Sequence, residues 1–173
     1  MRNLAILLLL ATTATVGLAG DLKGKGEVAG FGGGVWISED DIGTKKFVGG
    51  SVGGGVTSTT LVYGEFAFIP VINEGGFKAR VYDFQGGIKQ NLMTSDKVEP
   101  YVILGAGMGR LSVTGPGTSG ESESAFAIHL GAGVRLYASP KWGIQPEFKY
   151  GRYFFNGDGV NVARFGAGVF FQW

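Results

Sequence analysis

Apolar and polar residues alternate with a period of two through most of the chain after residue 20, in stretches separated by turn residues. This alternation is typical of β-strands that have one apolar face, and no stretch keeps the period of about 3.6 residues expected of an amphipathic helix. The sequence therefore predicts an all-β fold of eight antiparallel strands. Their expected ranges are 26–37, 46–57, 60–70, 79–90, 99–112, 124–137, 142–154 and 161–173.

The first residues have the features of a secretory signal peptide. Arg2 supplies a positive start, residues 4–11 form an apolar run, and Gly17-Leu18-Ala19 offers small residues for cleavage. The run is too short for a membrane-spanning helix, which needs about 20 residues. We expect a cleavable signal peptide over 1–19, export through the Sec pathway, and a single β-barrel domain over 20–173.

Composition excludes several classes of function. Without Arg2 the basic and acidic residues cancel, so no basic surface for nucleic acid is expected. The chain has no Cys and one His, which argues against disulfides and zinc, and we expect neither a metal nor a cofactor. The acidic segment Glu39-Asp40-Asp41 is interpreted as solvated loop charge rather than a calcium site.

The expected connections alternate in length. Short ones are predicted around Ser58 and over 91–97 and 138–141, where Pro140 cannot extend a strand ladder. Longer, more polar ones are predicted over 38–43, 71–78, 113–124 and 156–159. Short turns on the periplasmic side and four longer extracellular loops are typical of an up-and-down barrel in an outer membrane.

Glycine indicates which face meets lipid. In the second expected strand Val48, Val52 and Val56 share one face, and glycines 49, 53 and 55 share the other. A solvated outer surface gains nothing from glycine, which weakens strands, whereas a narrow closed lumen needs small residues beside large ones. We therefore expect the apolar face to point to lipid. A soluble calyx of the lipocalin type is the alternative fold.

Charged residues fall on the same parity as the glycines. A Lys or Arg that faces lipid at mid-depth costs about 2 to 4 kcal/mol, so these side chains should point inward and pair with one another. The sequence predicts an interior ion network of Glu65, Asp83, Arg135, Glu147, Lys149 and Arg164.

Three basic residues lie on the apolar parity instead. Arg80, Arg110 and Arg152 each fall at the expected extracellular end of a strand. At that depth a guanidinium meets lipopolysaccharide phosphates, which it can bind bidentately. The alternative interpretation is that the three side chains simply extend into water.

The end of the chain resembles the C-terminal signal of outer-membrane proteins, which the barrel-assembly machinery reads. The matching residues are Gly168, Phe171 and Trp173, while Gly166 stands where that signal usually has a polar residue. Segments 100–107 and 143–150 are similar to the fifth and seventh strands of the OmpA-type family of small outer-membrane barrels. This resemblance implies an integral outer-membrane barrel. No cell-wall-binding domain follows Trp173, so we expect no anchoring role.

Three functions follow from these expectations. The first is a monomeric structural protein that contacts outer-membrane lipid and lipopolysaccharide and offers its loops to host or surface ligands. The second is a narrow channel, which opens if Glu147 and Lys149 exchange partners with Glu65 and Arg135. The third is an enzyme that modifies lipid A, with His129 as base. Gly131 stands where the deacylase pattern has Ser, so we expect no enzymatic activity.

Overall fold

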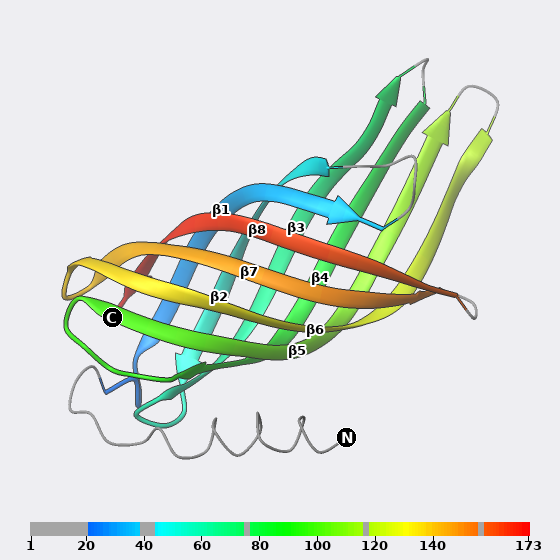
Figure 1. Cartoon of the computed structure of the whole chain (residues 1–173). Coiled ribbons are helices and arrows are strands. Elements are labelled where there is room, and N and C mark those ends of the chain that lie inside the picture. Colours follow the sequence, from blue (N-terminus) through cyan, green and yellow to red (C-terminus); the bar gives the residue numbers. More distant parts are fainter. Residues whose placement is uncertain (1–20, 39–43, 75–76, 116–117, 156–157) are drawn as a thin grey trace.

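The computed structural model describes residues 21–38, 44–74, 77–115, 118–155 and 158–173. Within them each strand pairs antiparallel with the next and the last pairs with the first, which closes an eight-stranded barrel (Figure 1). None of the described residues forms a helix that is both long and apolar enough to span a membrane. The strands are β1 (Gly26–Ile37), β2 (Thr44–Gly55), β3 (Thr60–Glu74), β4 (Phe77–Asn91), β5 (Val98–Gly115), β6 (Thr118–Ser139), β7 (Trp142–Phe155) and β8 (Asp158–Gln172).

Alternate side chains point to opposite sides of the barrel wall, as the sequence predicts. Leu130 and Leu104 are 60% and 62% exposed on the outside, whereas Arg135 and Asp83 are 0% exposed on the inside. Exposed large apolar side chains occur on all eight strands, which a water-soluble monomer rarely tolerates. The predicted orientation is confirmed, because the apolar residues face outward and the charges lie within.

Glycines on the inner face allow the strands to curve into a narrow cylinder. A Cβ built on Gly107 of β5 would lie 2.1 Å from the carbonyl oxygen of Phe84 on β4. A side chain at this position would force the backbones apart. On the outer face a Cβ on Gly64 would meet nothing within 4 Å. The inner glycines are therefore a steric requirement of closure, and Gly64 is not.

The two ends of the barrel differ, and we call them the turn end and the loop end. The turn end carries the described segments 56–59, 92–97 and 140–141 and both ends of the barrel chain. Leu22 closes it by packing with Leu61 and Tyr101, and Leu22 N donates to Ser58 O at 3.1 Å. The loop end carries the opposite ends of the strands, on either side of the gaps between the described ranges.

Three of the four predicted long loops are shorter in the structure than the sequence predicts. The β3–β4, β5–β6 and β7–β8 hairpins continue until two residues remain between the strands, so most of 71–78 and 113–124, and half of 156–159, is strand. The first two hairpins project beyond the rest of the barrel (Figure 1). Continued pairing satisfies the backbone N–H and C=O groups of these residues. The acidic segment 39–41 and the expected signal peptide 1–19 lie outside the described residues.

Candidate functional site

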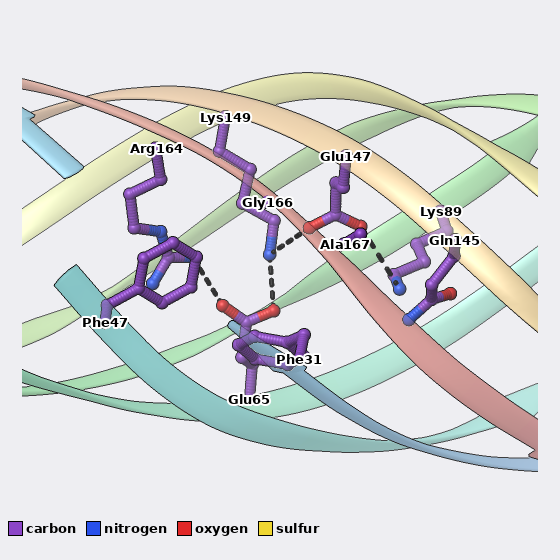
Figure 2. A pocket seen from close by; sticks show the side chains of 10 residues that line it. All are labelled: Phe31, Phe47, Glu65, Lys89, Gln145, Glu147, Lys149, Arg164, Gly166 and Ala167. Carbon is purple, nitrogen blue, oxygen red and sulfur yellow. Dashed lines mark hydrogen bonds and ion pairs between the residues drawn. The ribbon is translucent and has the colours of Figure 1, made fainter. Parts of the chain in front are cut away.

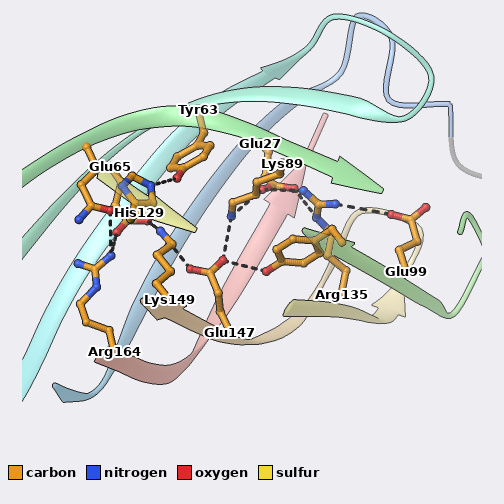
Figure 3. Close-up of polar contacts among 12 residues, drawn as sticks. Glu27, Tyr63, Glu65, Lys89, Glu99, His129, Arg135, Glu147, Lys149 and Arg164 are labelled. Carbon is orange, nitrogen blue, oxygen red and sulfur yellow. Dashed lines mark hydrogen bonds and ion pairs between the residues drawn. The ribbon is translucent and has the colours of Figure 1, made fainter. Parts of the chain in front are cut away.

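Acidic and basic side chains alternate along the interior of the barrel in one continuous chain (Figure 3). Among the described residues this charge chain has nine members, five acidic and four basic, and neighbouring members lie at most 3.9 Å apart between nitrogen and oxygen. Such alternation offsets the cost of removing each ion from water. The members, in order, are Asp83, Arg164, Glu65, Lys149, Glu147, Lys89, Glu27, Arg135 and Glu99.

The middle of the barrel contains the tightest part of the charge chain (Figure 2). Glu65 on β3 accepts from both Lys149 on β7 and Arg164 on β8. Arg164 also reaches Asp83 on β4 at 3.0 Å, and Lys149 lies 3.1 Å from Glu147. Residues from four strands are thereby held together across the lumen.

A second group of contacts lies toward the turn end. Arg135 on β6 donates through Nε to Glu27 on β1 at 2.9 Å and through a terminal nitrogen to Asn91 at 2.8 Å. Glu99 lies 3.9 Å from Arg135 and accepts from the Tyr137 hydroxyl at 2.8 Å. These hydrogen bonds join β1, β4, β5 and β6.

Lys89 connects the two groups through longer contacts. Its ammonium lies 3.4 Å from Glu147 and 3.9 Å from Glu27. The same nitrogen is 5.3 Å from the ring centroids of both Tyr63 and Tyr101, a distance at which the ring faces attract a cation. Since Lys89 is 1% exposed, the rings take the place of water around part of its charge.

The structure places all six residues of the predicted ion network inside the barrel. Five of them meet in the middle, but Arg135 does not join Glu65, because β6 places it opposite Glu99 near the turn end. Sequence reasoning missed three members of the chain, Glu27, Lys89 and Glu99. The same parity signal could have found them, since each alternates with an exposed apolar residue.

The loop-end part of the interior is apolar. Val35, Ile37 and Ile69 are at most 9% exposed and pack with Ala127 and Val162 in one cluster. Next to this cluster, a cavity of about 20 Å³ lies between members of the charge chain and Gln145 (Figure 2). That volume holds roughly one water molecule. The inward side chains of the charge chain and of the apolar cluster are nearly all buried in the part of the chain that the structure describes, so they occupy most of the lumen.

His129 lies inside the barrel and not at the lipid surface. Its Nε2 is 2.8 Å from the Tyr63 hydroxyl, and Nδ1 has no hydrogen-bond partner among the described residues. Gly131 offers no nucleophile on the same face. The described residues also contain no group of three or more His, Cys, Asp or Glu suited to a metal ion.

The three outward arginines do not share one environment. Arg80 and Arg110 lie on the neighbouring strands β4 and β5 near the loop end, and both are exposed. Arg152 lies on β7, opposite Asn161 of β8. Its guanidinium is 5.9 Å from the Phe154 ring centroid and lies across Gly159, where a Cβ would be 2.2 Å from Nε.

The predicted assembly residues lie at the seam where β8 meets β1. Phe171 and Trp173 face outward with ring centroids 6.3 Å apart, and the Trp173 ring covers Gly26. Gly168 faces inward, where a Cβ would lie 2.7 Å from Gly30 O. These positions give the three residues packing roles in the closed barrel.

A closed eight-stranded cylinder with an apolar exterior and a paired ionic interior defines the class of small transmembrane β-barrels. Residues 4–172 match the family described as "Outer membrane protein beta-barrel domain", and the chain belongs to this family. It is therefore a protein of the outer membrane, which excludes the soluble calyx. Comparison with curated protein sequences gives no match.

Several solved structures share the fold. Neisserial surface protein A has a TM-score of 0.74 at 15% identity, covering 87% of this chain and 100% of its own. Ail of Yersinia pestis has a TM-score of 0.58 at 20% identity, covering 86% and 99%. The N-terminal barrel of OprF from Pseudomonas aeruginosa has a TM-score of 0.55 at 16% identity, covering 87% and 98%.

Proposed function

We propose that the protein is a closed structural barrel of the outer membrane that presents the β3–β4 and β5–β6 hairpins outside the cell. The filled lumen is the observation that supports this function. The charge chain occupies the middle and turn-end interior, the apolar cluster occupies the loop-end interior, and the cavity between the charges holds about one water molecule. An interior packed in this way favours rigidity over transport.

We propose in addition that the two projecting hairpins bind ligands at the cell surface. Ail of Yersinia pestis was solved with sucrose octasulfate, a heparin analogue. Sulfated polysaccharide is therefore a suitable first probe. We also propose that the protein is a monomer and that Gly168, Phe171 and Trp173 are read by the barrel-assembly machinery.

The test separates the structural role from surface binding. Cells that lack the protein are complemented either with wild type or with a variant in which Asn-Gly replaces residues 114–120, which shortens the β5–β6 hairpin and keeps the ladder up to Val113 and Glu121. We expect both to restore resistance to bile salts, and only wild type to restore heparin binding to whole cells. Unchanged bile-salt resistance in the deletion strain would contradict the structural role. Equal heparin binding by both complemented strains would contradict a role of the β5–β6 hairpin in surface binding.

A narrow channel is the second candidate, and the long contacts of Lys89 favour it. A link of 3.4 and 3.9 Å is easier to open than the direct hydrogen bonds of Glu65. Planar-bilayer recordings of wild type, Glu65→Ala and Lys89→Ala would test this. If all three proteins stay silent, the channel is rejected.

We propose no catalytic function for His129. The Tyr63 hydroxyl holds the ring inside the barrel, away from the acyl chains that a lipid A deacylase must reach. Overexpression should therefore leave the mass spectrum of lipid A unchanged. A new lipid A species that disappears in a His129→Ala variant would reverse this conclusion.

A further inference from the structure

Two outward arginines lie beside each other on the loop-end wall of the barrel. Arg80 on β4 is opposite Ser112 on β5, and Arg110 on β5 is opposite Tyr82 on β4. Arg80 and Arg110 are therefore diagonal neighbours on one face, a relation that places Cβ atoms about 7 Å apart. Both side chains are exposed, so their guanidinium groups can converge on one ligand.

Aromatic side chains directly below the pair show its depth in the membrane. Tyr82 packs against Phe68 with ring centroids 5.5 Å apart, and Phe66 packs against Phe84 at 4.9 Å. All four face outward on β3 and β4, and such aromatic girdles lie at the membrane interface. Going from Tyr82 toward the loop end, Arg80 is the next outward residue of β4. This position places its guanidinium at the level of the lipid headgroups.

The surroundings of the pair suit an anion. Arg110 donates to the Ser122 hydroxyl at 3.1 Å, and β6 places Ser124 opposite Arg110 and Ser122 opposite Ser112. The described outward side chains at this level of β4, β5 and β6 are basic or carry hydroxyl groups. Guanidinium forks and hydroxyl donors together match the oxygens of a phosphate.

We propose that Arg80 and Arg110 together bind one phosphate group of lipid A, with the serines of β5 and β6 as additional donors. In the outer leaflet, lipid A carries phosphate at the headgroup level, where this pair lies. Arg152 is not part of the site, because its guanidinium lies across Gly159 of its own chain. The inference depends on the outer-membrane location and not on the proposed function of the barrel.

Native mass spectrometry of the purified barrel can test this site with defined lipids. The probes are bis-phosphorylated lipid A, chemically dephosphorylated lipid A and phosphatidylglycerol. The proteins are wild type, Arg80→Gln, Arg110→Gln, the double variant, and two controls, Arg152→Gln and Lys141→Gln. Lys141 is exposed at the turn end, so its replacement removes the same charge far from the proposed site. Heat-modifiable gel migration checks that each variant is folded.

We expect wild type to prefer the phosphorylated lipid A, and the double variant to bind it roughly tenfold more weakly. Each single variant should lose part of this affinity, the two controls should stay close to wild type, and dephosphorylated lipid A should not distinguish wild type from the double variant. Three results would overturn the proposal: full affinity in both single variants, an equal loss in Lys141→Gln, or equal binding of phosphatidylglycerol by wild type.

Discussion

The ammonium nitrogen of Lys89 lies 3.4 Å from a carboxylate oxygen of Glu147, and this contact joins the two halves of the charge chain. On one side Glu147 continues to Lys149 at 3.1 Å, and on the other Lys89 continues to Glu27 at 3.9 Å. The stability of the interior therefore depends on one buried lysine whose own ion pairs are long. This relationship gives the first prediction.

Replacing Lys89 with methionine should destabilise the barrel by about 3 kcal/mol. The substitution keeps most of the volume but leaves Glu27 and Glu147 with one cationic partner fewer, and a buried ion that loses a partner is costly. The measurement is urea unfolding in lipid vesicles. Lys141→Met is the matched control, because an exposed turn lysine should matter by no more than about 0.5 kcal/mol. Equal unfolding curves for the two variants would show that the charge chain does not stabilise the fold.

Glu65→Gln should cost about 3 to 5 kcal/mol, since Lys149 and Arg164 then lose their shared carboxylate. Combining Glu65→Gln with Lys149→Met should cost less than the sum of the single changes, by about 1 to 3 kcal/mol. The check is a double-mutant cycle from the same unfolding measurements. Strict additivity would mean that the two side chains are not energetically coupled.

Alanine should have opposite effects on stability at Gly107, which lies on the inner face, and at Gly64, which lies on the outer face. Gly107→Ala points a methyl group at the Phe84 carbonyl, only 2.1 Å away, and should cost roughly 1 to 3 kcal/mol. Gly64→Ala meets nothing within 4 Å and should stabilise its strand by roughly 0.5 to 1 kcal/mol. Thermal unfolding in one detergent compares the two variants directly. A larger loss for Gly64→Ala would contradict the assignment of inner and outer faces.

Alternation was sufficient to predict the eight strands and the side of the barrel wall on which Glu65, Asp83 and Lys149 lie. If a strand exchanged its two faces, all of its charged side chains would face lipid. It could not predict which charges pair. Pairing depends on the stagger between strands, and that stagger places Arg135 beside Glu27 and Glu99 rather than beside Glu65.

The alternation in the sequence also could not predict how far the hairpins extend. Polar residues such as Ser122 were interpreted as loop, yet Ser122 is opposite Ser112 of the expected fifth strand, in a ladder that continues toward the tip of the hairpin. The three missed members of the charge chain are a different case. Their parity was visible beside Val28, Ile88 and Val98, so a stricter use of alternation would have included them.

Variants at the seam can separate packing from recognition by the assembly machinery. Gly168→Ala should weaken the purified, refolded barrel, because a Cβ there would lie 2.7 Å from Gly30 O and 2.8 Å from the Phe31 Cβ. Trp173→Ala removes an exposed ring over Gly26 and should change refolding in vitro little while lowering the assembled amount in cells. Refolding yield and outer-membrane levels are the two measurements. Normal outer-membrane levels of Trp173→Ala would argue against the proposed assembly signal.

The central claim is that aliphatic side chains face acyl chains while the charge chain fills a closed interior. The chain has no Cys, so single cysteines introduced at Leu104, Leu130 and Val169 can carry spin labels without background. Accessibility to oxygen and to a water-soluble nickel complex, measured in vesicles, reports the surroundings of each label. The structure predicts high oxygen and low nickel accessibility at all three positions, and high nickel accessibility at any of them would contradict it.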